Sequence, residues 1–272
     1  EFHSGKHYLP PNTQPIHLEV TNMIKQQYKW LTDIFVAHRG LFDNNNKIPE
    51  NSIPAFQRAV ANGFGIETDV QMSKDGVLVV FHDDTLDRMT GVHGKLCDYT
   101  FAELRTFRLL DTDYQIPTFE EFLTAANGVN LIVEIKTHDD IGEVEQKTYD
   151  MLKGYKGNYC VESFNPLIIR WFKVHAPEVI RGTLSCAYDG AQMSNFRKWL
   201  LRELKLCKWN GSQFIAFDAA TIATNKAVAK FRKKIPIICW TIKSQQQYEE
   251  LKPYFDNIIF DSYVPTTTGT QD

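Results

Sequence analysis

The sequence lacks an excess of charge of one sign. Thirty basic residues stand against 33 acidic residues in a chain of 272, which leaves a formal net charge of -3 at neutral pH. A strongly basic balance would indicate nucleic acid or an anionic membrane surface as the partner, and this balance indicates neither. Any anion that the protein binds must therefore be held by a local group of side chains.

Long apolar runs and closely spaced cysteines are also missing. No stretch approaches the roughly 18 apolar residues that span a bilayer, and the N-terminus has no charged start followed by an apolar signal core. The five cysteines are widely spaced and include no CxxC pair, so neither a disulfide framework nor a zinc site is indicated. We expect the cysteines to be small core residues and the protein to be cytoplasmic. A signal or anchor upstream of Glu1 stays open.

Short apolar runs alternate with segments of helical length along most of the chain. Eight such runs occur: DIFVAHR, GFGIETDV, NLIVEIK, YCVESF, EVIRGTLS, QFIAFDA, IPIICWTI and NIIFDS. This alternation predicts a parallel sheet, and eight units favour closure into a TIM (β/α)8 barrel, with a doubly wound open sheet as the alternative. We expect residues 31–272 to form a single domain, preceded by an arm and a covering helix over residues 1–30.

One stretch interrupts the alternation. The sequence VQMSKDGVLVVFHDD contains two strand-like runs separated only by SKDG, whereas a parallel crossover needs about a dozen residues or more. We therefore expect a β-hairpin over Val70–Phe81 after the second strand. The hairpin would return His82 to the mouth of the barrel, where barrels of this class carry their active sites.

Carboxylates stand at the ends of two of the expected strands. Alternation of side chains places Glu67 and Asp69 on one face of GIETDV, and Glu134 and Lys136 on one face of LIVEIK. An arbitrary acidic pair on a strand more often faces solvent. Three carboxylates at one rim instead predict a hard divalent cation, Mg²⁺ or Ca²⁺, which would offset their repulsion and desolvation. Lys136 could reach a phosphate oxygen from the same rim.

Two histidines are expected at the same mouth. His38 ends the first apolar run and His82 follows the hairpin. A lone histidine at a strand end is more often structural, but two imidazoles at one mouth could take a proton from an attacking oxygen and return one to a leaving oxygen. Asp83 either orients an imidazole or serves as a turn residue. The remaining candidates, His93, His138 and His175, show no partner pattern and are assigned no role.

The polar residues around the first strand have competing interpretations. Arg39 offers a planar fork suited to phosphate, or it pairs with Glu50. Asn51 and Ser52 directly precede an expected helix, and capping of its free amides explains both. Glu50 is given a supporting role.

Trp240 lies in the run IICWTI. The strand period places Trp240 on one face with Ile238 and Ile242. Trp240 is therefore either a core residue or a side chain that closes the mouth against the carbon atoms of a substrate.

Taken in order, the motifs AHRG, PENS, GIETDVQMSKDGVLVVFHDDTLDRMTG, IPTFEEFL, VEIK, ESFN and CWTI resemble the glycerophosphodiester phosphodiesterase family over about residues 34–262. The resemblance implies a TIM barrel with a small insertion at about residues 83–115. It also implies metal-dependent hydrolysis of a small-molecule glycerophosphodiester to glycerol 3-phosphate and an alcohol. By position, the resemblance implies an acid/base pair (His38, His82), metal ligands (Glu67, Asp69, Glu134) and phosphate contacts (Arg39, Lys136).

Two other hypotheses stay open. The first is a catalytically inactive barrel that binds a phosphate ligand, although such a protein would be expected to have lost a histidine or a carboxylate. The second is a lipid phosphodiesterase similar to sphingomyelinase D, which would expose an apolar interfacial loop. The loop expected over residues 83–114 is instead rich in charge, which favours a soluble, deacylated substrate. No nucleic acid partner or membrane segment is expected, and the oligomeric state is not readable.

Overall fold

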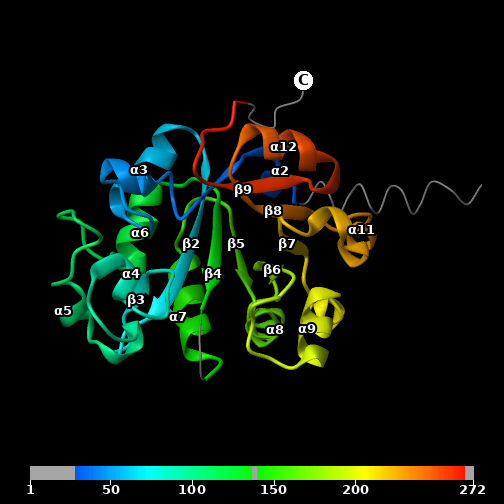
Figure 1. The fold of residues 1–272 in the computed structure, drawn as a ribbon. Coiled ribbons are helices and arrows are strands. Elements are labelled where there is room, and N and C mark those ends of the chain that lie inside the picture. Colours follow the sequence, from blue (N-terminus) through cyan, green and yellow to red (C-terminus); the bar gives the residue numbers. More distant parts are fainter. Residues whose placement is uncertain (1–27, 137–139, 267–272) are drawn as a thin grey trace, which may run out of the picture.

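Eight parallel strands form a closed barrel in the computed structural model, which describes residues 28–136 and 140–266 (Figure 1). The strands are β1 (Val36–His38), β2 (Gly65–Met72), β4 (Leu131–Ile135), β5 (Tyr159–Ser163), β6 (Ile180–Ser185), β7 (Phe214–Asp218), β8 (Ile237–Ile242) and β9 (Asn257–Phe260). Strand β1 pairs in parallel with both β2 and β9, so the ring of eight parallel strands is closed. The predicted barrel is confirmed, and the open-sheet alternative is wrong.

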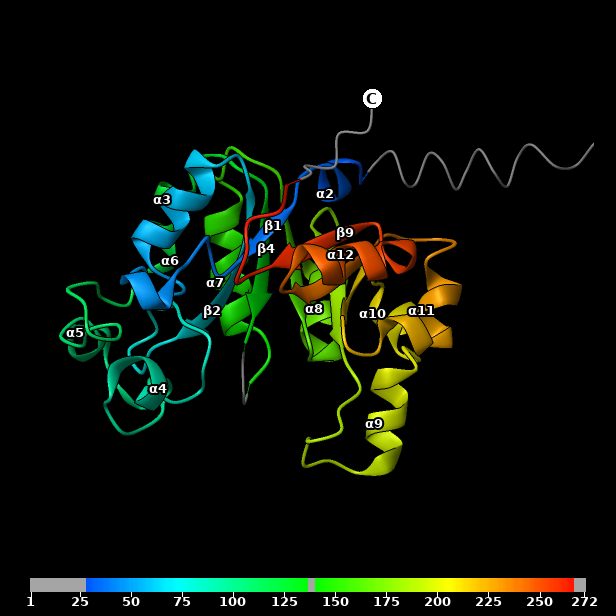
Figure 2. The same cartoon turned by 45° about the horizontal axis from the view of Figure 1, so that its top comes forward.

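Helices surround the barrel on its outer face (Figures 1 and 2). The longer ones are α3 (Ile53–Ala61), α6 (Phe119–Ala126), α7 (Glu143–Leu152), α8 (Pro166–His175), α9 (Asn195–Arg202) and α12 (Gln245–Leu251), and the shorter ones are α10 (Cys207–Asn210) and α11 (Lys226–Phe231). Thr118 caps α6 with a capping box, and Asn165 caps α8, which begins at a proline. Within the described ranges, no helix combines the length and apolarity needed to cross a bilayer.

The hairpin predicted over Val70–Phe81 is present. Strand β3 (Leu78–Val80) pairs antiparallel with the end of β2, with Val70 opposite Val80. The amide of Phe81 then donates to the carbonyl of Asp69 over 3.1 Å. This contact returns the chain to the barrel rim at His82.

The segment that follows the hairpin contains α4 (Asp87–Thr90) and α5 (Phe101–Leu104). It has a small apolar cluster of its own, which includes Leu86, Met89 and Leu96. The segment therefore packs as a satellite beside the rim and fixes the path of the chain around His82.

Two apolar layers hold the barrel. The inner layer fills the barrel with one or two side chains from each contributing strand, among them Ile132, Phe214 and Ile238. The outer layer packs the other face of the strands against the helices. Tyr28 and Leu31, at the start of α2 (Trp30–Asp33), belong to the inner cluster. The arm and covering helix predicted over residues 1–30 otherwise lie outside the described residues.

The cysteines follow the prediction in part. Cys160, Cys207 and Cys239 are buried and unpaired. Cys97 is exposed and Cys186 is half-buried, so the expectation of five core cysteines is wrong at these two positions. Both lie in connecting segments and not in the strands, where alternation would have placed them inside.

The tight inner packing yields a test at Gly182. In β6, Gly182 stands opposite Phe214 of β7, and a Cβ at this position would come within 2.3 Å of the Phe214 ring. We expect Gly182→Ala to lower the free energy of unfolding by about 2 kcal/mol, as overpacking does. Urea denaturation measures the change. Gly190→Ala is the control, because nothing lies within 4 Å of its Cβ, and equal stability of the two variants would contradict this packing.

Candidate active site

The carboxyl ends of the strands surround a cavity of about 550 Å³. Side chains from opposite sides of the barrel meet there because each strand contributes the residue at its end. Most of the predicted site residues line this cavity: His38, Arg39, Glu67, His82, Glu134 and Trp240. Asp69 and Lys136 lie behind the lining, and Asp69 is only 1% exposed. The eight predicted residues therefore form one site.

The turn after β1 brings two groups into the cavity. Arg39 and Gly40 both have positive φ, at 54° and 79°. A side chain at Gly40 would come within 2.9 Å of the Ala55 backbone, so only glycine fits this left-handed position. The turn directs the Arg39 amide at Oε2 of Glu67, to which it donates over 3.1 Å. This is the structural reason for a glycine directly after His38 and Arg39.

Three carboxylates converge beside this turn. Glu67, Asp69 and Glu134 each place an oxygen within 4.8 Å of the others, because β2 and β4 are paired with Asp69 opposite Glu134. Oδ1 of Asp69 is paired with Nζ of Lys136 over 3.3 Å. A buried set of three carboxylates matches the ligand chemistry of a hard divalent cation. The residues present therefore fit the predicted cation.

Crowding of these acids changes their protonation. Burial, reinforced by the neighbouring Asp69, raises the pKa of Glu67 well above its usual range. Burial also raises the pKa of Glu134 to about 8. Asp69 behaves oppositely: although burial opposes its charge, Lys136 and His82 hold the pKa of Asp69 below its usual range. Glu67 and Glu134 thus favour their neutral forms, and a bound cation would be needed to keep all three carboxylates ionised together.

The ammonium group of Lys136 contacts two of the three carboxylates. Its Nζ lies 3.3 Å from Oδ1 of Asp69 and 3.5 Å from Oε1 of Glu134. Although burial disfavours an ammonium group, these two carboxylates raise the pKa of Lys136. In this arrangement Lys136 partly neutralises the acids while its charge borders the cavity.

His38 is held by a residue that the sequence analysis did not identify. Its Nδ1 lies 2.9 Å from Oδ2 of Asp261, and its Nε2 lies 3.9 Å from Oε2 of Glu67. Burial lowers the pKa of His38, while Asp261 acts in the opposite direction. Because an ionised carboxylate can only accept, Nδ1 of His38 carries the hydrogen and Nε2 remains available. The signal for Asp261 was its place near the end of the last apolar run, NIIFDS.

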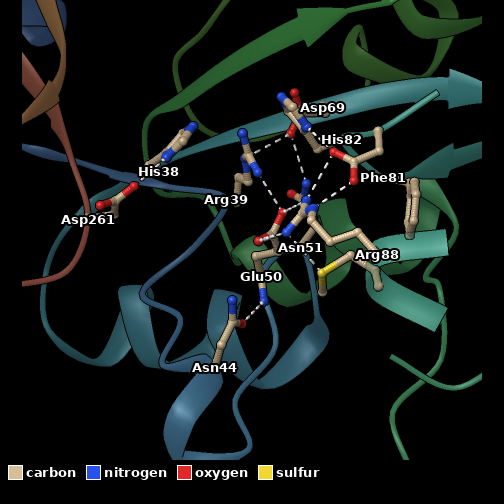
Figure 3. A network of polar contacts seen from close by, with 12 residues as sticks. His38, Arg39, Asn44, Glu50, Asn51, Asp69, Phe81, His82, Arg88 and Asp261 are labelled. Carbon is tan, nitrogen blue, oxygen red and sulfur yellow. Dashed lines mark hydrogen bonds and ion pairs between the residues drawn. The ribbon is translucent and has the colours of Figure 1, made fainter. Parts of the chain in front are cut away.

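His82 is held in the same way by the adjacent residue. Its Nδ1 lies 2.6 Å from Oδ1 of Asp83, which supports the orienting role considered for Asp83. Burial lowers the pKa of His82, and Asp69 opposes that shift. Figure 3 shows His82 and His38 on opposite sides of Arg39 in that view. Each imidazole therefore has its Nε2 free of its aspartate.

A second ion-pair network lies beneath Arg39 (Figure 3). Arg39 donates to Oε1 of Glu50 over 2.5 Å, so the pairing considered for Arg39 is present. Arg88 donates to both oxygens of Glu50, over 2.7 and 2.8 Å, and its Nε donates to Asp83 over 2.7 Å. Arg88 thus bonds both to Asp83, which holds His82, and to Glu50, which holds Arg39. No pattern in the sequence indicated this connection.

The capping explanation for Asn51 and Ser52 is wrong. Ser52 occupies the N-cap position of α3, but its hydroxyl donates to the Pro49 carbonyl over 2.5 Å instead of accepting from the helix. Asn51 donates to Oδ2 of Asp69 and accepts from the Thr68 hydroxyl, each over 2.8 Å. The amide of Asn51 therefore orients a carboxylate of the site.

Trp240 borders the cavity and packs edge-on against Phe164, with ring centroids 5.6 Å apart. Trp240 and Ile238 belong to the inner layer, but Ile242 belongs to the outer layer. The expectation that all three share one face is wrong, because the pairing of β8 with β9 shifts register between Cys239 and Ile242.

Glu162 is a further acid that the sequence analysis did not single out. It is the penultimate residue of β5, is 1% exposed and lines the cavity. Burial raises its pKa well above the usual range, and the charge of Glu134 adds to this effect. A glutamate in the run YCVES, placed like Glu134 in LIVEI, was the signal that could have found it.

The fold and the site define a TIM barrel with an acidic, histidine-containing cavity at its mouth, and the comparisons with known proteins identify its family. The model of the glycerophosphoryl diester phosphodiesterase family matches residues 38–262, so the chain belongs to this family. Glycerophosphodiester phosphodiesterase from Caldanaerobacter subterraneus is 36% identical over 163 residues, which cover 56% of this chain and 66% of that protein. Mouse glycerophosphodiester phosphodiesterase 1 is 36% identical over 146 residues, but the alignment covers only 43% of its length.

Solved structures agree on the fold. A phosphodiesterase from Oleispira antarctica, solved in complex with the product sn-glycerol-3-phosphate, superposes with a TM-score of 0.73 at 22% identity, covering 86% of this chain and 94% of that one. A glycerophosphodiester phosphodiesterase from Thermotoga maritima gives a TM-score of 0.66 at 27% identity over 84% of this chain and 94% of its own.

The Arg88 network predicts a pH-dependent stability. Although both carboxyls are partly desolvated, Arg88 lowers the pKa of Glu50 from 4.5 and that of Asp83 from 3.8, each to about 2. Carboxyls with a lowered folded-state pKa stabilise the protein above their unfolded pKa and lose that contribution as the pH falls through the folded value. We expect Arg88→Met to cost about 2 kcal/mol near neutral pH, less than a fully buried pair because Arg88 is half-exposed.

That deficit should shrink as the pH falls from 4.5 towards 2, as urea denaturation over a pH series would show. Arg108→Met provides the control, since its exposed guanidinium is bonded only to the Arg105 carbonyl, over 3.5 Å, among the contacts described. A deficit that stays constant down to the lowest pH at which the protein folds would argue against these ion pairs.

Proposed function

We propose that this chain is a metal-dependent glycerophosphodiester phosphodiesterase that releases glycerol 3-phosphate and an alcohol. The observation that carries the proposal is the meeting of two aspartate-held histidines and a carboxylate trio around one cavity. Family membership supports the reaction class, and the product bound by the Oleispira antarctica enzyme supports a small glycerophosphate ligand. The cavity, at about 550 Å³, suits a ligand of that size.

The two imidazoles would perform the proton transfers. With Nδ1 engaged by Asp261 or Asp83, each ring offers Nε2 to the cavity. One ring, with Nε2 unprotonated, accepts the proton of the attacking hydroxyl, and the other ring, protonated as the imidazolium, donates its Nε2 proton to the departing alcohol oxygen. The lowered pKa values of His38 and His82 suit the accepting ring, while the aspartate bonded to the donating ring favours its protonated form.

Positive groups would hold the phosphate. Glu67, Asp69 and Glu134 are the residues that would bind the divalent cation, Mg²⁺ or Ca²⁺, whose charge, when bound, withdraws electron density from the phosphorus. Arg39 and Lys136 add fixed positive charge at the same rim. Glu50 and Asn51 keep Arg39 and Asp69 oriented, so that little reorganisation is needed on binding.

Several finer features belong to the same proposal. Trp240 would pack against the carbon atoms of the glycerol moiety. The unpaired thiols favour a reducing compartment such as the cytoplasm. The insertion proposed for about residues 83–115 would serve mainly to hold Asp83 and Arg88 at the rim.

The decisive experiment measures glycerol 3-phosphate release from a panel of glycerophosphodiesters in the presence of Mg²⁺ or Ca²⁺. We expect His38→Ala and His82→Ala each to lower kcat by about 10²–10⁴-fold, the usual contribution of a general acid or base, while circular dichroism shows an intact fold. His93→Ala is the control, because its side chain is 98% exposed.

Near-wild-type turnover in either site variant would remove that histidine from the mechanism. No turnover of any substrate by a folded wild-type protein that still binds glycerol 3-phosphate would instead favour the inactive, ligand-binding barrel.

A further inference from the structure

Helix α9 carries two large aromatic side chains that the described part of the chain leaves partly uncovered. None of its residues is buried. Phe196 is 66% exposed and Trp199 is 42% exposed, and their rings stack with centroids 5.8 Å apart. Exposing such an aromatic pair to water is unfavourable, so its position on a free surface indicates an interaction site.

The aromatic pair lies on the mouth side of the barrel. Helix α9 follows β6, whose carboxyl end belongs to the rim. Figures 1 and 2 show α9 on the flank opposite α4, with both helices towards the lower end of the barrel in these views. A surface touched by α9 would therefore lie near the entrance of the cavity.

Basic residues concentrate around the same helix. Residues 186–236 contain ten lysines and arginines against three acids, although the whole chain carries a net charge of -3. Nζ of Lys205 lies 5.1 Å from the centre of the Trp199 ring. Lys205 and Lys208 also share a groove of about 490 Å³ with three lysines of the α11 region, with Glu203 the single acid among the described residues that line it.

We propose that this basic flank, residues 195–234, docks the protein on an anionic lipid bilayer. Lysines and arginines are attracted to anionic head groups, and tryptophan and phenylalanine insert at the boundary between head groups and acyl chains. A soluble polyanion would match the charge but would offer no apolar layer for the uncovered side of Phe196 and Trp199. Docking requires no catalysis, so it is independent of the proposed function.

Co-sedimentation of the full chain with lipid vesicles tests the proposal. We expect binding to vesicles of phosphatidylcholine mixed with phosphatidylglycerol, little binding to phosphatidylcholine alone, and loss of binding at high salt. The double variant Arg197→Glu with Lys208→Glu should weaken binding by about thirtyfold or more, since each basic residue near such a surface contributes measurably. Phe196→Ser with Trp199→Ser should abolish stable docking.

Matched controls change exposed residues away from the flank. Lys95→Glu with Arg108→Glu makes the same charge change, and Tyr114→Ser removes an exposed aromatic ring. Both controls should bind as the wild type does, and unchanged thermal midpoints would show that every variant is folded. Equal binding by flank and control variants, or no preference for anionic vesicles, would overturn the proposal. So would gel filtration showing a dimer that the aromatic variant disrupts and that binds no vesicles.

Discussion

The confinement of three carboxylates within 4.8 Å of one another at the mouth of the barrel is the constraint on which the rest of the site depends. Such a group is unfavourable by itself, because burial and mutual repulsion both oppose ionisation. Nearby residues offset this repulsion in part: Lys136 and Arg39 supply positive charge, and Asn51 donates a hydrogen bond to Asp69. A divalent cation would complete the balance, and the site is thus already arranged for the charge of cation and phosphate together.

Around this centre, each candidate catalytic histidine is fixed by an aspartate. Asp261, after the last strand, holds His38 from the far end of the sequence, and Asp83 holds His82 from within the post-hairpin segment. Arg88 then joins Asp83 to Glu50 and so to Arg39. The closed barrel makes the contact between His38 and Asp261 possible, because closure places β1 beside β9. Preorganisation of this kind is what lets weakly basic groups act in a defined geometry.

The sequence predicted the parts of this arrangement that follow from regular structure. Strand alternation is strict, so Glu67, Asp69 and Glu134 could be placed at one rim, and the short SKDG link required a hairpin that returns His82. Interactions that depend on irregular segments could not be derived in this way. The path after the hairpin determines where Arg88 lies, and a register shift in β8 separates Ile242 from Trp240.

The net charge of the whole chain also concealed a local concentration of basic residues. The net charge of -3 argued against an anionic surface as partner, yet residues 186–236 are strongly basic. The charged loop over residues 83–114 argued against an interfacial enzyme, while the exposed aromatic rings lie on α9, after a different strand. Neither the sum of charges nor one loop could show how such residues gather on one flank of the folded barrel.

The central claim is that the carboxylate trio binds a divalent cation, and calorimetric titration of metal-stripped protein with Mg²⁺ and with Ca²⁺ tests it most directly. The account predicts saturable binding of one ion by the wild type, and loss of that binding in Glu134→Gln but not in Glu145→Gln, a buried glutamate of α7 outside the cavity. Equal binding by the Glu134→Gln variant and the wild type, or no binding by a folded wild type, would contradict it.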